Sequence, residues 1–200
     1  MADRRRDRGT RAQAHTLEGL VAALLVLASV LFALQSTAVT PLSASTSNQH
    51  IENQQRAMGA DVLATAAANG TLTDAVVFWN RSADGFVGSD GEPYHDGGPP
   101  NQFGHALNET FFDERVAFNV VVAYHEQGGG IQTQRMVYMG NPTDNAVRVG
   151  RSVVLTDDTE LVGSAGNVSA AAAAGEFYAP DVSGDKLFNV VEVRLIAWRI

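Results

Sequence analysis

The chain has 200 residues, of which 45% are hydrophobic, and it contains no cysteine. That length allows one modest domain with its own core plus an anchor, and the missing cysteine excludes disulfides, thiolate metal sites and cysteine nucleophiles. The net charge is −8, which divides into +3 over residues 1–13 and therefore −11 over the remainder. Because such an acidic chain lacks the basic surface that nucleic-acid binding requires, we expect no nucleic-acid partner.

Arginine supplies 13 of the 14 basic side chains, and Lys186 is the single lysine. An acidic protein with almost no lysine is typical of salt-loving archaea, because carboxylates keep a protein soluble when salt screens ordinary repulsion. A GC-rich genome would also favour arginine over lysine. The composition therefore indicates a halophilic source but has this second explanation.

A transmembrane helix over residues 17–40 is the first element that the sequence predicts. No charged side chain occurs in residues 19–50, and about 20 helical residues rising ~1.5 Å each span the ~30 Å hydrocarbon core of a bilayer. Arginines crowd the preceding residues 1–16, a basic cytoplasmic leader, so the positive-inside rule places the C-terminal part outside the cell. We therefore expect a single-pass protein of the cell membrane, held in the lipid bilayer, with a cytoplasmic N-terminus and an extracellular head.

A secretory signal peptide is the alternative, since it also combines a basic start with an apolar core. Its core usually spans about 7–15 residues and ends at a site resembling Ala-x-Ala. Here the apolar run has 16 residues, 19–34, and reaches 21 when it is extended through Val39. The triplet Ala38-Val39-Thr40 is only a weak match to the cleavage site, so the length favours a permanent anchor.

Four Asn-x-Ser/Thr tripeptides support an extracellular head, because this tripeptide is the acceptor for N-glycans in secreted proteins. The candidate glycosylation sites are Asn69, Asn80, Asn108 and Asn167. Each lies near a turn-forming residue, which suits a surface position.

Glu18 stands directly before the apolar run and has two interpretations. A carboxylate in the first turn of a helix is favoured by the helix dipole, and Thr16 is a suitable N-cap. Alternatively, a carboxylate taken into an apolar bundle must find a cation or lose its charge, which indicates a pairing role.

The segment Gln13-Ala14-His15-Thr16-Leu17-Glu18, preceded by basic residues and followed by an apolar helix, resembles the prepilin signal of type IV pilins and their archaeal relatives. The phrase His-Thr-Leu-Glu-Gly followed by the Leu/Val/Ala run is also similar to pilin-like membrane proteins of halophilic archaea, an otherwise uncharacterised family. The resemblance covers about residues 4–40.

This resemblance implies processing by a prepilin peptidase on the cytoplasmic side, with the apolar segment kept on the mature protein. In that family a glutamate at the fifth mature position pairs with the N-terminal amine of a neighbouring subunit. Counting back from Glu18 places the cut between Gln13 and Ala14, whereas the family usually has a small residue before the cut. A cut after Ala12 supplies that residue but moves Glu18 to the sixth position, so both registers stay open.

One stripe of the apolar helix carries leucines at spacings of 4, 3 and 4, which we expect to pack against other pilin-like subunits. The small residues Gly19 and Ala23 beside them would allow close approach of two helices. The leucines are Leu20, Leu24, Leu27 and Leu31.

Residues 41–68 predict a linker followed by a second helix. Pro41 cannot join a regular helix without a kink, so the first helix is expected to bend or break near Thr40. Residues 43–47 then form a short linker or a weakened helix, and the spacing of apolar residues in 48–68 predicts a helix that Gly70 closes.

The extracellular head, residues 69–200, is predicted to be α+β, with an antiparallel sheet of about four strands and the long helix against one face. Residues 72–79 suit a short helix or strand, and the glycine- and proline-rich residues 84–104 predict a loop. Single helical turns are expected at 106–115 and 170–174. Alternation of apolar residues predicts strands at 116–124, 131–139, 147–155 and 187–200. The last is apolar enough to be a central strand or one packed on the N-terminal helix.

No catalytic motif is present, so we expect no enzyme activity and no cofactor. The glycines at 128–130 lack the Lys-Ser/Thr of a phosphate loop, and no Gly-x-Ser-x-Gly elbow occurs. Four potential metal ligands gather in or near the glycine-rich loop, but their spacing matches no known site, which favours a polar surface and no bound metal. They are His95, Asp96, His105 and Glu109.

The sequence therefore favours a structural role, as a type IV pilin-like surface protein that is a filament subunit or minor pilin. A membrane-anchored surface binding module that never polymerises is the alternative, in which Glu18 only caps its helix. A metal-dependent enzyme that uses the His/Asp loop of the ectodomain is a remote third hypothesis.

Overall fold

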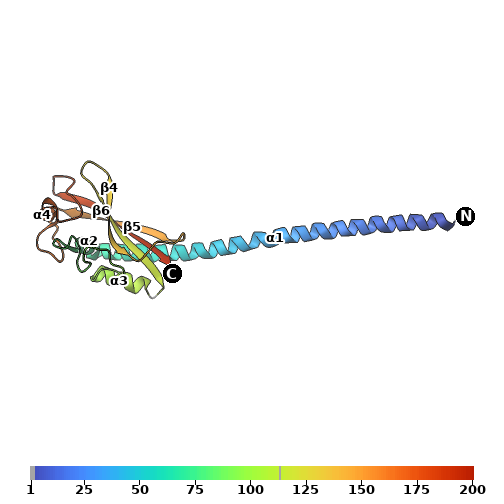
Figure 1. Ribbon diagram of the computed structural model, residues 1–200, viewed down its shortest axis with the longest axis horizontal. Helices are drawn as coiled ribbons and strands as arrows, with labels where there is room; N and C mark the ends of the chain where they lie inside the picture. The colour runs from blue at the N-terminus through green and yellow to red at the C-terminus, as the bar shows by residue number, and fades with distance from the viewer. Residues whose placement is uncertain (1–2, 113) are drawn as a thin grey trace. The chain divides into compact units, whose positions relative to one another are not determined.

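The computed structural model describes residues 3–112 and 114–200, and within them the side chains of residues 15–34, 49–112 and 114–200. The chain divides into two compact units, residues 1–50 and 51–200. Figure 1 shows a long N-terminal helix and, in the second unit, a sheet accompanied by short helices. In chain order the elements are α1 (Asp3–Ala68), α2 (Thr71–Val76), β1 (Trp79–Asn80), β2 (Gly85–Phe86), α3 (Gln102–Phe111), β3 (Val116–His125), β4 (Ile131–Tyr138), β5 (Val147–Thr156), α4 (Val168–Ala173) and β6 (Leu187–Arg199).

α1 is one helix of 66 residues. The helical backbone is therefore continuous, so two of the predicted alternatives, a break near Thr40 and a non-helical linker at residues 43–47, are wrong. Proline lacks the backbone N–H that the helical ladder uses, and the helix nevertheless continues past Pro41. The predicted closing residue is correct, because Gly70 has a φ of 84°, in the left-handed region that ends helices.

The predicted α+β head with a four-stranded antiparallel sheet is confirmed. The strand order is β4-β3-β6-β5, and all three pairings are antiparallel. β6 is central, one of the two positions that its density of apolar residues predicted, because it pairs with β3 on one side and β5 on the other. The glycines at 128–130, all with positive φ, connect β3 to β4.

Helices cover one face of this sheet, which we call the inward face. Gly59 of α1 lies against Val149 of β5 and Leu195 of β6, and Phe111 of α3 packs on Phe118 of β3 with ring centroids 5.7 Å apart. α2, α3 and the C-terminal part of α1 accordingly lie on the same side of the strands (Figure 1). The five inward residues of β6 are at most 1% exposed: Asn189, Val191, Val193, Leu195 and Ala197.

Trp79 holds the irregular segments of the head together. Its ring contacts Phe86 edge-on at 5.2 Å and Tyr178 at 5.0 Å between centroids. Its indole Nε1 donates a hydrogen bond of 2.9 Å to the backbone oxygen of Glu176. Because a buried indole needs a partner for its N–H, this bond joins the short β1–β2 hairpin to the segment after α4.

α3 is a helix of 10 residues that begins and ends four residues earlier than the helical turn predicted at 106–115. Asn101 caps it by accepting a hydrogen bond of 3.0 Å from the backbone nitrogen of Gly104, which is the usual role of asparagine at a helix start. A side chain at Gly104 would collide with the carbonyl oxygen of Pro99. The predicted glycine- and proline-rich loop therefore ends earlier than expected, in a tight entry to α3.

Candidate functional site

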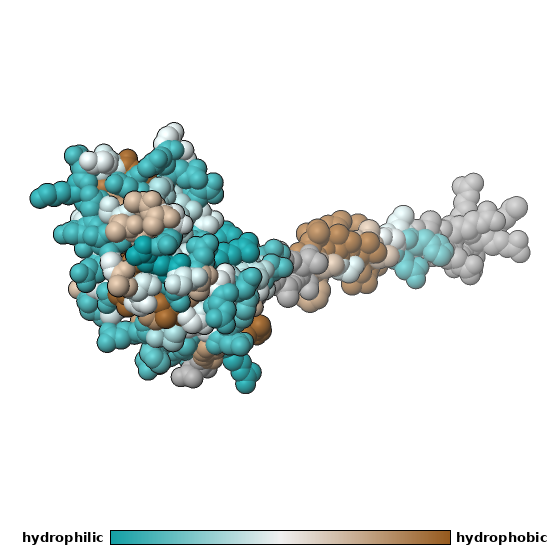
Figure 2. Space-filling model, turned by 60° about the vertical axis from the view of Figure 1, so that its left-hand side comes forward, coloured by the Kyte–Doolittle hydropathy of each residue, from teal (hydrophilic) through white to brown (hydrophobic). Residues whose placement is uncertain are grey.

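The apolar part of α1 is uncovered along its whole length. His15–Leu34 comprises 20 residues of mean hydropathy 2.5, and none of them is buried. Figure 2 shows most of this stretch as a hydrophobic band, with hydrophilic residues at its N-terminal end. The polar Ser29 within it donates a hydrogen bond of 2.8 Å to the carbonyl oxygen of Val26, so its hydroxyl is satisfied inside the helix, as a lipid environment requires.

By length and composition this segment can cross a membrane, and it is the single one of its kind in the described part of the chain. An N-terminal signal sequence has the same properties. The structure therefore establishes a membrane-compatible N-terminal helix, which is the common part of both sequence-based interpretations.

Glu18 lies in the first turns of this segment beside His15. Its Oε2 is 3.6 Å from Nδ1 of His15, and the two side chains are 81% and 82% exposed. A contact between two side chains this exposed contributes little free energy. The carboxylate is thus open to a second molecule.

The expected helix-packing residues are also open. Leu20, Leu24 and Leu27 are 60–61% exposed and Leu31 is 53% exposed. No atom lies within 4 Å of the position that a side chain at Gly19 would take. This stripe, with Ala23 beside it, is available to lipid or to another helix.

The predicted processing residues are Gln13 and Ala14, and their backbone is helical, as part of α1. Their side chains lie outside the described residues. The peptidase cut between them stays a prediction.

The four candidate glycosylation sites differ in how their side chains are used. Asn69 is exposed at the end of α1, and its Oδ1 accepts hydrogen bonds from the backbone nitrogen and Oγ1 of Thr71, at 3.2 and 2.7 Å. The other three, Asn80, Asn108 and Asn167, are half-buried. Their Oδ1 atoms accept hydrogen bonds from backbone N–H groups: Asn80 in a turn, Asn108 from the loop at residue 98, and Asn167 at the start of α4.

The four potential metal ligands do not form one cluster. Nδ1 of His95 lies 3.0 Å from the carbonyl oxygen of Tyr138 at the end of β4, whereas His105 and Glu109 lie exposed on α3. Within the described residues, no three His, Asp or Glu side chains are placed to hold a metal ion.

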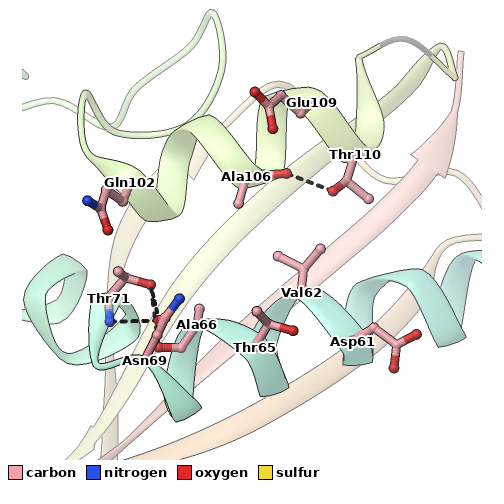
Figure 3. A pocket seen from close by; sticks show the side chains of 10 residues that line it. All are labelled: Asp61, Val62, Thr65, Ala66, Asn69, Thr71, Gln102, Ala106, Glu109 and Thr110. Carbon is pink, nitrogen blue, oxygen red and sulfur yellow. Dashed lines mark hydrogen bonds between the residues drawn. The ribbon is translucent and has the colours of Figure 1, made fainter.

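A groove of about 440 Å³ runs between α1 and α3 and is open to solvent. Figure 3 shows the two helices in front of the strands, with Val62 directed toward α3 and the carboxylates of Asp61 and Glu109 at the margins. We call it the helix groove. It is lined by Asp61, Val62, Thr65, Ala66, Asn69, Thr71, Gln102, Ala106, Glu109 and Thr110.

A second groove, of about 510 Å³, lies on the sheet face opposite α1 and α3, which we call the outward face. We call it the sheet groove. The register of β5 and β6 pairs Arg148 with Ile196 and Gly150 with Arg194. It is lined by Val121, Arg148, Val149, Gly150, Glu192, Arg194 and Ile196.

Neither groove was predicted from the sequence. Arg148 and Arg194 are 46 residues apart, so only the strand register places them on one surface. The available signal was that both arginines alternate with apolar residues, which marks the solvent side of a strand. That signal identifies the face of each strand but not its neighbour.

Comparison with known proteins places this architecture in a family. The model of a family described as "Family of unknown function (DUF7288)" matches residues 11–197. The chain belongs to this family. Over nearly its full length the chain is also similar to an uncharacterized protein of Archaeoglobus fulgidus, which is 28% identical over 94% of this chain and 92% of the relative. No solved structure matches the chain.

Proposed function

We propose that this member of the DUF7288 family is a type IV pilin-like surface protein with one membrane span, acting as a filament subunit or minor pilin. The observation that carries the proposal is the position of Glu18. This exposed carboxylate lies near the start of a 20-residue apolar helical segment whose side chains are not buried. Its N-terminus would lie in the cytoplasm and its head outside the cell, following the arginine-rich leader.

The chemistry of Glu18 supports a contact between subunits. A lone carboxylate surrounded by apolar helices is costly unless a cation neutralises it. Cleavage between Gln13 and Ala14 by a prepilin peptidase would create a positively charged amine one helical turn before Glu18. In a staggered bundle of helices, the amine of one subunit then reaches the carboxylate of the next.

The apolar stripe supports the same arrangement. Leu20, Leu24, Leu27 and Leu31 are more than half exposed in the single chain, so they have surface to bury against a neighbour. Gly19 and Ala23 leave room for two helices to approach closely. In lipid there is no hydrophobic driving force between helices, so this close packing is what favours their association.

The first experiment is to determine the mature N-terminus of the membrane-extracted protein by mass spectrometry, in cells with and without the prepilin peptidase. We expect a peptidase-dependent start between residues 13 and 15. An intact start at residue 1 or 2 would contradict processing, and a start after residue 38 would contradict the anchor itself.

A second experiment separates processing from assembly. In Glu18→Gln the side chain keeps its shape but loses its charge, so we expect filament or multimer yield to fall while the protein stays in the membrane fraction. The matched control is Glu52→Gln, a glutamate of the same helix outside the apolar segment. Equal multimer yields for both variants would contradict the pairing role of Glu18.

A membrane-anchored binding module that does not polymerise is the second candidate. The sheet groove favours it, since an open sheet face with arginines can receive an anionic ligand. An unprocessed N-terminus together with a monomeric protein would support this candidate over the first.

A further inference from the structure

The outward face of the sheet is the positively charged part of an acidic head. Residues 51–200 hold nine of the 14 basic side chains but 19 of the 22 acidic ones. Four charged side chains of the strands alternate with the inward residues and therefore face outward: Arg135, Arg148, Arg194 and Glu192. Three positive charges thus stand against one negative charge on this face.

An ion pair and a glycine form the floor of the sheet groove. Nε of Arg194 lies 2.7 Å from Oε2 of Glu192, so the one carboxylate is occupied by an arginine of its own strand. Gly150 lies beside this pair on β5, and a side chain there would collide with Oε1 of Glu192. Arg148 next to it is exposed and carries the excess positive charge.

Apolar side chains surround these arginines on the outward face. Val154 of β5 and Ile131 of β4 are 59% and 57% exposed. Ile196 and Val121 line the groove itself and are half-buried. A mixed apolar and arginine-rich surface has the composition of a protein-binding surface.

The helix groove has the opposite charge. Its charged lining residues are Asp61 and Glu109, both exposed, and no lysine or arginine of the described residues lines it. Val62, Ala66 and Ala106 provide an apolar floor between them (Figure 3). The two grooves are therefore complementary in charge and similar in size.

The grooves lie on opposite sides of the head. α1 packs on the inward face through Gly59, and the helix groove lies between α1 and α3 in front of the strands (Figure 3). The sheet groove lies on the outward face. The two grooves of one copy therefore cannot both face the same groove of a partner. If two sheet grooves faced each other, arginines would lie against arginines.

We propose that the sheet groove of one copy docks on the helix groove of the next copy, with Arg148 and Arg194 facing Asp61 and Glu109. This rests on the proposed function, because it supplies the contact between heads of adjacent subunits. A contact between two different surfaces repeats from copy to copy, so it builds a ring or an open filament rather than a closed dimer. Charge complementarity sets its direction.

Cysteine cross-linking of the full chain in membranes tests this contact directly, because the natural chain has no cysteine. Ser152→Cys places a thiol on the outward face beside Glu192, and Thr65→Cys places one in the helix groove. When the two single variants are co-expressed with tags of different size, we expect a mixed disulfide dimer. A chain carrying both substitutions should give a ladder of multimers.

Charge reversal tests the complementarity. Arg148→Glu with Arg194→Glu in one chain, or Asp61→Arg with Glu109→Arg in another, should each lower cross-linking roughly tenfold, because like charges then face each other. Co-expression of the two reversed chains should restore it. Arg148→Glu alone leaves the Arg194–Glu192 pair intact, so a loss of cross-linking in this variant would not be due to a disrupted pair. Arg199→Glu is the control, because Arg199 lies outside both grooves.

Three results would overturn the proposal. Disulfide dimers of Ser152→Cys with itself would indicate a symmetric sheet-to-sheet contact. Cross-links that survive both charge reversals would show that charge does not determine the contact. Absence of mixed cross-links from protein whose N-terminus is processed would reject this head contact and leave the proposed pilin-like function standing.

Discussion

Gly59 of α1 lies directly against Val149 of β5: a methyl group added at Gly59 would be 3.0 Å from Cγ2 of Val149 and 3.2 Å from Cδ2 of Leu195. Such a distance is too short for an added side chain unless its neighbours move. The close approach of helix and sheet at this point therefore depends on a residue without a side chain.

We predict that Gly59→Leu destabilises the head by about 1–3 kcal/mol, the usual cost of overpacking a core. The measurement is urea unfolding of the full chain in detergent micelles, followed by the fluorescence of Trp79 and Trp198, which are buried. Ala60→Leu, at the exposed neighbouring position, is the matched control. Val149→Ala should recover part of the loss in the Gly59→Leu background, and equal stability of the Gly59 and Ala60 variants would contradict the packing.

Asn189 is a buried polar residue whose removal should be costly. It is 0% exposed, and its Nδ2 donates to the carbonyl oxygens of His125 and Pro180 at 3.0 and 2.8 Å, while its Oδ1 accepts from the nitrogen of His125. Asn189→Leu keeps the size but leaves these backbone groups without partners, which costs about 1–3 kcal/mol. We expect Asn141→Leu, at an exposed asparagine, to cost less in the same urea experiment.

Tyr94 should make the head sensitive to alkali. Its hydroxyl donates a hydrogen bond of 2.6 Å to the carbonyl oxygen of Val87, and burial raises its pKa to about 12. A phenol whose pKa is higher in the folded state contributes stability that is full below its unfolded pKa near 10 and is lost as the pH rises through the folded pKa. Burial also raises the pKa of Tyr178, which acts in the same direction.

We therefore predict that the urea midpoint of the natural chain falls between about pH 10 and pH 12. Tyr94→Phe should be less stable at pH 8, because a hydrogen bond is lost, but its midpoint should fall less steeply above pH 10. Parallel curves for the two proteins would show that Tyr94 does not titrate with unfolding.

Glycan attachment should favour Asn69 among the four candidate sites. It is the exposed one, whereas the side chains of Asn80, Asn108 and Asn167 are half-buried and hold turns and helix ends through their Oδ1 atoms. If modification follows folding, Asn69→Gln should remove most of the glycan mass measured by intact-protein mass spectrometry. Retention of that mass, with its loss in Asn108→Gln, would contradict the order of accessibility.

Local patterns of the sequence determined which elements form. The alternation of Val116, Phe118, Val120 and Val122 predicted β3, because a strand with one buried face repeats every two residues. The uncharged residues 19–34 predicted the apolar helix, since this property belongs to composition and length alone. The central place of β6 also followed, because strands covered by two neighbours carry more apolar residues.

The tertiary structure decided what depends on contacts between distant residues. The sequence predicted an interruption near Pro41 from local proline chemistry, yet α1 continues through it. The grooves, the outward position of Arg148 beside Arg194 and the burial of Asn189 arise from strand order and register, which no short-range pattern encodes. Periodicity assigns each residue to a face of its own element, whereas its neighbours are chosen by packing across the whole head.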